Sequence, residues 1–187
     1  SKGYSAFYQT YVQLEITFDP AIIDPEGTGD PDVIGRANFD GLIKQALRER
    51  FPDVTSRSEK RNLYGIVSGG ASYDLRERVL ENPSLIGQTR TIWLISGDDF
   101  DMLNKGYIDP TVDEGDRRLN DQEVSWYNQL VEAGAVEKQF HTGFFTSGDS
   151  REPELAGIWG AAVGSFYTLL VTLALSFPIG VLAAIYL

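Results

Sequence analysis

The sequence predicts an α+β domain, a small sheet with several helices, over residues 1–152, followed by a transmembrane α-helix over residues 153–187. The first observation is that every charged residue lies at or before Glu154. The second is that apolar residues in the first part recur with the spacings typical of half-buried strands and amphipathic helices. The third is that the remainder is an uncharged, largely apolar run, longer than a buried core helix needs.

Three segments predict the strands of the sheet. Apolar and polar residues alternate along residues 11–18, which is typical of a strand with one buried face. Residues 91–95 (TIWLI) form a short apolar run and are the best candidate for a central strand. Residues 136–145 are expected to form the final strand.

Helices are predicted from apolar periodicity, capping residues, and the Gly or Pro residues that end them. The clearest is residues 120–133, where Asn120 and Glu123 resemble a capping box and Gly134 follows the last turn. Ser72 and Asp98 are expected to cap two shorter helices. The other predicted helices cover residues 38–51, 58–67, 72–81 and 98–104, and residues 24–32 and 147–153 are predicted to be a loop and a linker.

The apolar C-terminal run has the length and composition of a membrane span. Between Phe166 and Leu187 there are twelve Leu, Ile, Val or Phe residues. These contribute about −4 to −7 kcal/mol to insertion, and no charge opposes them. Trp159 and Tyr186 are separated by about 40 Å of helix, which matches the two headgroup regions of a bilayer. The chain begins without Met and ends within this run, so we expect it to be a piece of a longer protein.

Small residues form a stripe along the predicted membrane helix. They recur at spacings of three or four, and Gly160 and Gly164 form a GxxxG pair. Small side chains let helices in lipid approach closely, which predicts packing against a partner helix, although Gly and Ala are common in membrane helices generally. Pro178 is predicted to kink the helix. The predicted packing residues are Gly157, Gly160, Ala161, Gly164, Thr168, Thr172, Ser176 and Gly180.

Composition excludes several classes of function. The net charge of −11 lies entirely in the first part and argues against binding to nucleic acid or to an anionic membrane surface. The absence of cysteine excludes a thiolate metal site or a disulfide framework. The sequence predicts no catalytic, cofactor-binding or metal site, and the protein is not expected to be an enzyme.

Four groups of residues and the single residue His141 are candidate sites, and a structural interpretation is favoured for each. Carboxylates in the 24–32 loop could ligate Ca²⁺, but their spacing is not that of an EF-hand. Residues 68–72 could form an anion nest, although a helix end followed by a helix start explains the glycines. The 98–101 carboxylates suit a helix N-terminus, and His141 has no second histidine or thiol beside it. The cations Arg57, Lys60 and Arg61 could attract an anion such as phosphate, with a solvated helix face favoured.

The C-terminal segment resembles the PstA family of phosphate ABC transporter permeases. In that family, a stretch like GI-x-x-A-x-x-GS-x-x-x-TL opens the first helix of the permease core and continues through P-x-G to A-x-IYL. The match covers about 33 residues. Its positions in this chain are Gly157, Ile158, Ala161, Gly164, Ser165, Thr168, Leu169, Pro178, Gly180, Ala184, Ile185, Tyr186 and Leu187. The preceding part resembles an extra N-terminal domain of unknown function that some of these permeases carry between their first membrane helix and the core.

The resemblance implies a permease subunit in the bacterial inner membrane with residues 1–152 extracytoplasmic. Its implied partners are a second permease subunit, an ATPase subunit and a phosphate-binding protein. Four aromatic residues could contribute contacts with the binding protein: Tyr4, Phe7, Tyr8 and Tyr11. The resemblance places the ATPase-coupling loop and the later path-lining helices beyond Leu187. The alternative hypothesis is an extracytoplasmic sensor or protein-interaction domain anchored by a single helix.

Overall fold

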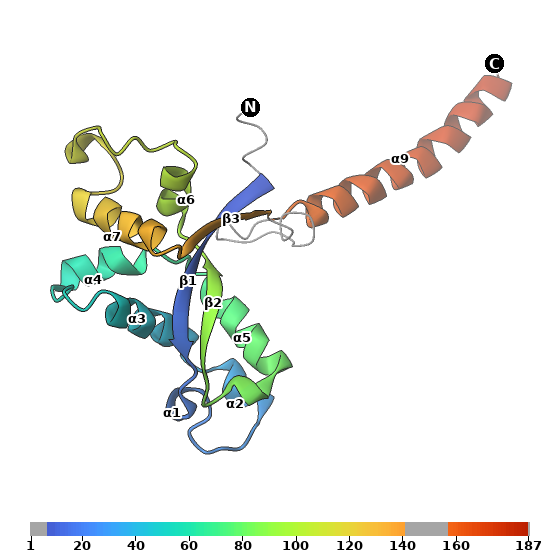
Figure 1. Ribbon diagram of the computed structural model, residues 1–187. Coiled ribbons are helices and arrows are strands. Elements are labelled where there is room, and N and C mark those ends of the chain that lie inside the picture. Colours follow the sequence, from blue (N-terminus) through green and yellow to red (C-terminus); the bar gives the residue numbers. More distant parts are fainter. Residues whose placement is uncertain (1–6, 141–156, 187) are drawn as a thin grey trace. The chain divides into compact units, whose positions relative to one another are not determined.

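The computed structural model describes residues 7–140 and 157–186, and the contacts divide the chain into two units, Ser1–Phe140 and His141–Leu187 (Figure 1). The first unit is the predicted α+β domain, a three-stranded antiparallel sheet with several helices. The described part of the second unit, residues 157–186, contains an apolar helix. The predicted domain boundary at residue 152 and residues 141–145 of the predicted last strand lie outside the described residues.

The sheet is built around strand β1 (Tyr8–Thr17), which pairs with β2 (Thr89–Ile95) on one side and β3 (Val136–Phe140) on the other. In register, Tyr11 lies opposite Ile95 of β2, and Tyr8 lies opposite Phe140 of β3. The chain therefore enters and leaves this sheet at the same end. Both pairings are antiparallel, as expected for a sheet with one face in a core and one toward solvent.

The expectation that residues 91–95 form the central strand is wrong, because β2 is an edge strand of the named sheet. Its apolar end is buried for a different reason. Val67 forms an isolated antiparallel bridge with Ser96, and the main-chain N–H of Ser68 donates to the Ile95 carbonyl at 3.0 Å. This short segment covers the outer edge of β2 at that point, whereas Thr91 remains exposed.

The predicted alternation along β1 is confirmed. The side chains of Val12, Leu14, Ile16 and Phe18 are at most 3% exposed and form the centre of the core. The opposite face is polar and half-buried or exposed; there the hydroxyls of Thr17 and Thr89 share a 3.0 Å hydrogen bond across the strands. One face of the sheet thus carries the core.

The helices of the domain follow β1 in two groups, before and after β2. In Figure 1, α3, α4 and α7 lie together on one side of β1. The elements are α1 (Pro20–Ile23), α2 (Pro31–Gly35), α3 (Phe39–Arg50), α4 (Arg57–Tyr64), α5 (Ala71–Glu81), the 3-10 turn η2 (Pro83–Leu85), α6 (Asp98–Asn104), the 3-10 turn η3 (Glu114–Asp116) and α7 (Asp121–Glu132).

Capping residues begin and end the longest of these helices as predicted. The Asn38 side chain accepts a hydrogen bond from the Gly41 main chain at the start of α3. Asn120 and Glu123 form a reciprocal capping box on α7, with both bonds at 2.8 Å. Gly134 has a φ of +68° just after α7, a conformation that favours glycine and closes the helix.

Other helix boundaries differ from those predicted. A capping box between Ser56 and Glu59 begins α4 earlier than expected, and α4 ends at Tyr64 rather than at residue 67. The main chain beyond α4 bonds to the segment after β2 instead of continuing the helix: the Gly97 N–H donates to the Ile66 carbonyl at 3.0 Å. A Cβ on Gly97 would collide with the Gly65 carbonyl oxygen, so glycine permits this close approach.

Two predicted caps are also wrong. Gly70 rather than Ser72 occupies the cap position of α5, and the Ser72 hydroxyl donates to the Gly69 carbonyl. Asp98 is the first residue of α6 and not its cap. The short helices α1 and α2 were not predicted, although each begins with a proline after an aspartate cap, an arrangement that favours helix starts.

Candidate functional site

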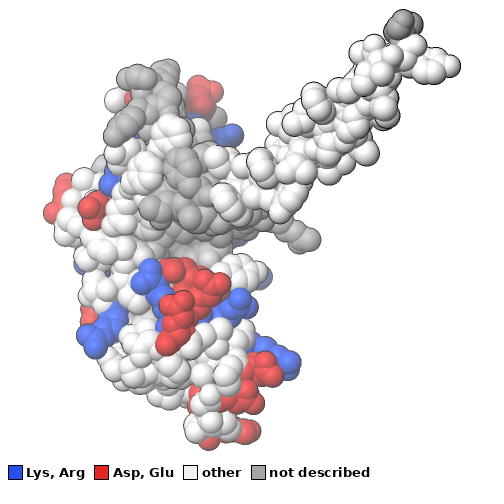
Figure 2. All heavy atoms as spheres, turned by 90° about the vertical axis from the view of Figure 1, so that its right-hand side faces the viewer, with Lys and Arg blue, Asp and Glu red and all other residues white. Residues whose placement is uncertain are grey.

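The second unit contains helix α9 (Trp159–Tyr186), which is long and apolar enough to span a membrane. Its 28 residues correspond to about 42 Å of helix, close to the thickness of a bilayer with its headgroups. Its large apolar side chains, such as Leu169, Leu173 and Phe177, are exposed. The helix shows no charged side chain in Figure 2, in agreement with its sequence.

Three hydroxyl groups of α9, those of Thr168, Thr172 and Ser176, are hydrogen-bonded within the helix itself. Thr168 donates to the Gly164 carbonyl at 2.8 Å, and Thr172 donates to the Thr168 carbonyl at 2.7 Å. Ser176 continues the series with a 2.6 Å bond to the Thr172 carbonyl. Because the bilayer core offers no water, hydroxyls that bond to their own helix can lie there at little cost.

The small residues of α9 define one side of the helix, here called the small face: Gly164, Thr168, Thr172, Ser176 and Gly180. Each step of four residues turns the position by about 40° beyond a full turn, so the row winds slowly around the helix. At 100° per residue, Phe166, Leu170, Ala174 and Pro178 lie across the helix from this row, while larger residues such as Leu173 and Leu175 lie on its two flanks. A partner that followed the small face would cross α9 at an angle, as in right-handed GxxxG packing.

The remaining predicted packing residues lie at or just before the start of α9. Gly160 and Ala161 are in the first turn of α9, and Gly157 precedes the helix. The helix continues through Pro178, beside an apolar groove of about 480 Å³ that also involves Leu170, Leu173, Ala174 and Phe177. Packing at the small face and a kink at Pro178 stay predictions.

The carboxylates of the 24–32 loop organise its main chain. Asp24 accepts hydrogen bonds from the Gly29 N–H at 2.7 Å and from the main chain and hydroxyl of Thr28 at 3.0 and 3.1 Å. These bonds, the one from Gly29 foremost, lower the pKa of Asp24. Asp30 caps α2. Within the described residues no cluster of three or more His, Asp or Glu residues is placed to hold a metal ion.

The three carboxylates of α6 do not converge on one site. Asp98 and Asp99 reach Arg118, at 3.9 and 3.2 Å. Asp101 points into the core instead, where it accepts from the Thr10 main chain at 3.0 Å and from the Thr10 hydroxyl at 2.7 Å. Lys105 lies 2.5 Å from its other oxygen, and the side chains of Asp101 and Lys105 are 7% and 10% exposed.

The buried Asp101–Lys105 pair lies beside Thr10 of β1, where the Asp101 carboxylate accepts a hydrogen bond from the Thr10 main-chain N–H. The Thr10 carbonyl accepts from Ser96, at the end of β2, but the Thr10 N–H donates to the Asp101 carboxylate. Asn104 adds a 2.9 Å bond to the Thr10 hydroxyl. These contacts join α6 to β1, so the cluster is interpreted as structural and is here called the lock: Thr10, Asp101, Asn104 and Lys105.

We expect the domain to lose stability at alkaline pH because of the buried phenol of Tyr127 in α7. Burial, assisted by the negative charge of Asp101, raises the pKa of Tyr127 to about 12. In the unfolded chain this tyrosine ionises near pH 10. The stabilisation from keeping it neutral in the folded protein is therefore complete below pH 10 and is lost as the pH rises through about 12. It amounts to on the order of 3 kcal/mol. Urea unfolding between pH 9 and 12 should show this slope, and Tyr127→Phe should flatten it. An equal slope in both proteins would contradict the assignment.

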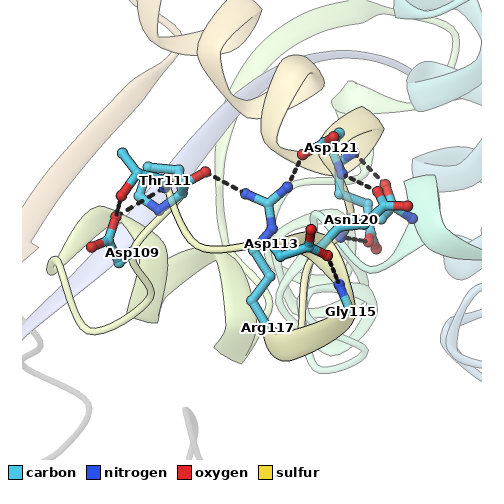
Figure 3. A network of polar contacts seen from close by, with 10 residues as sticks. Asp109, Thr111, Asp113, Gly115, Arg117, Asn120 and Asp121 are labelled. Atoms are coloured by element: carbon cyan, nitrogen blue, oxygen red, sulfur yellow. Dashed lines mark hydrogen bonds and ion pairs between the residues drawn. The ribbon is translucent and has the colours of Figure 1, made fainter.

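A second polar cluster, not anticipated from the sequence, orders the loop between α6 and α7 (Figure 3). Asp109 accepts from the main chain and hydroxyl of Thr111, and Asp113 accepts from the Gly115 main chain. Arg117 donates to the Pro110 carbonyl at 2.7 Å and pairs with Asp121. Its side chain is only 4% exposed. Aspartates two residues before Thr111 and Gly115 are the turn-forming pattern that could have predicted this order.

The other candidates from the sequence have structural roles or lie outside the description. The Ser68 hydroxyl accepts from the Gly70 main chain at 3.1 Å, which orders the start of α5. The ring of Tyr8 packs edge-on against Phe140 at 5.8 Å, and Tyr11 is half-buried. His141 and Tyr4 lie outside the described residues.

Together, the fold and α9 define an α+β domain joined to a segment that can span a membrane. The chain belongs to the family described as a domain of unknown function (DUF3333), whose profile matches residues 1–114. The match includes β1 and β2 and ends in the loop before α7, so β3 and α7 complete the domain beyond it. No curated protein and no solved structure matches the chain.

Proposed function

We propose that the chain is part of the membrane-spanning permease subunit of a phosphate-import ABC transporter. In this proposal α9 is the first helix of the permease core, and the domain lies on the extracytoplasmic side of the bacterial inner membrane. A partner ATPase subunit supplies the energy, a second permease subunit completes the path, and an extracytoplasmic binding protein delivers phosphate. The proposal builds on the resemblance of residues 154–187 to such permeases.

The observation that carries the proposal is the continuous row of small residues along α9. A single-helix anchor needs apolar length only, and lipid accepts large and small side chains all around it. The small face, with its hydroxyls bonded inside the helix, instead suits close contact with another helix. The large apolar residues around the rest of the helix would then face lipid or fill wider gaps.

Phosphate uptake by cells carrying the full-length protein tests the proposal. Gly164→Leu adds bulk to the small face and should lower uptake severalfold at unchanged membrane levels, because the partner helix is pushed away. Ala174→Leu adds a larger side chain on the opposite side and serves as the matched control; it should leave uptake near the wild-type rate.

The same cells separate transport from the alternative of an anchored sensor or interaction domain. Residues 1–187 contain no cysteine, so Gly164→Cys introduces the only thiol of this segment, and its cross-linking to another permease helix can be followed. A sensor held by one helix would show normal uptake in Gly164→Leu and no such cross-link. That result would reject the permease proposal.

A further inference from the structure

The end of α3 and the whole of α4 carry a charge opposite to that of the chain. Residues 44–61 contain six basic and three acidic residues, a net charge of +3, so the rest of the chain carries −14. The basic residues of this segment are Lys44, Arg48, Arg50, Arg57, Lys60 and Arg61. A local positive region can attract an anion even though the protein as a whole is strongly acidic.

Part of this charge is already engaged. Lys44 pairs with Asp40 at 2.5 Å, and Arg48 donates to the Tyr64 hydroxyl at 2.9 Å. Glu59, the acidic residue within α4, is engaged in the capping box with Ser56. Among the described residues, no carboxylate lies within ion-pair distance of Arg57, Lys60 or Arg61.

Two of these unpaired cations line a common hollow. Arg57, Ser58, Arg61 and Asn62 border a surface depression of about 540 Å³, and its border contains no acidic residue. Arg57 and Arg61 are four residues apart and therefore lie on the same side of α4. Like charges at this spacing destabilise an isolated helix by a few tenths of a kcal/mol, so the arrangement gains from a counter-anion.

We propose that this hollow, the Arg57–Arg61 hollow, binds a free tetrahedral oxyanion of the phosphate type. Two guanidinium groups offer paired N–H donors that match such an anion, and the Ser58 hydroxyl and the Asn62 amide supply further donors. The hollow has room for an anion of this size, and its border of four residues is far below the roughly 20–30 residues a side of a stable protein interface. The inference concerns a site in the domain and does not depend on whether α9 belongs to a permease.

The test is a titration of the whole chain in zwitterionic lipid nanodiscs with inorganic phosphate at constant ionic strength. Side-chain and main-chain nitrogen resonances of Arg57, Ser58, Arg61 and Asn62 should shift and saturate. The R57Q/R61Q variant should bind about tenfold or more weakly, because charge-assisted hydrogen bonds are lost. Its remaining spectrum should be unchanged, which separates loss of the site from unfolding.

The matched control is R36Q/R90Q, which removes the same charge from elsewhere in the domain and should retain the wild-type affinity. Equal weakening by R36Q/R90Q would overturn the proposal, since it would reveal binding by net charge alone. Shifts that do not saturate would overturn it as well. A final arm replaces phosphate with nanodiscs containing anionic lipid; shifts seen only there would identify a lipid headgroup as the ligand and overturn the free oxyanion.

Discussion

Replacement of Asp101 by alanine is expected to destabilise the domain by about 3–5 kcal/mol, because it leaves the Lys105 ammonium buried without its partner. The pair is nearly excluded from solvent, and the carboxylate also accepts both Thr10 bonds. The cost arises from the unpaired charge and the lost acceptor rather than from a large net gain of the ion pair. Urea unfolding of the whole chain in detergent, followed by near-ultraviolet circular dichroism, measures it.

Two variants make this expectation specific. Asp99→Ala removes a carboxylate from the same helix, but Asp99 is exposed and its partner Arg118 is exposed too, so a loss below about 1 kcal/mol is expected. The double change Asp101→Leu with Lys105→Met removes both charges and should be less damaging than Asp101→Ala alone. If Asp101→Ala costs no more than Asp99→Ala, Asp101 is not the lock between α6 and β1.

Local patterns predicted most of the fold, because each depends on residues that are neighbours in the chain. The period of two along β1 places Val12 and Leu14 in the core, and the Asn120–Glu123 box begins α7 where expected. The place of β2 in the sheet could not be predicted in this way. The apolar run at residues 91–95 is compatible with a central strand, and only the distant segment at Val67 shows why an edge strand is buried there.

The polar clusters likewise depend on contacts between residues that are far apart in the sequence, which local patterns do not predict. Asp101 lies in the first turn of α6, where a carboxylate is explained by the helix dipole alone. Its actual partner is Thr10, 91 residues away, and no spacing within α6 reveals that contact. That no described carboxylate pairs with Arg57 or Arg61 likewise depends on the engagement of Glu59 in the capping box with Ser56. The presence of helix α9, by contrast, could be predicted from the local sequence, since length and uninterrupted apolarity define a candidate span.

The largest expected effect is the loss of membrane attachment when two arginines are placed in the middle of α9. Leu170 and Leu173 lie near its centre, where each change from Leu to Arg costs about 3–4 kcal/mol of insertion free energy. Two changes cost about 6–8 kcal/mol, which equals or exceeds the gain estimated for the apolar residues of the helix. The chain expressed alone should then move from the carbonate-resistant membrane fraction to the soluble or aggregated fraction.

The control for this experiment is the pair Leu170→Ala and Leu173→Ala, which shortens the same side chains without adding charge. Its cost is expected to be about 1 kcal/mol in total, so the chain should stay in the membrane fraction. Retention of the double-arginine chain after carbonate extraction would mean that α9 does not hold the chain in the bilayer. In that case the exposed apolar surface of α9 would have to be covered by protein instead, and the small face would serve a soluble contact rather than a membrane one.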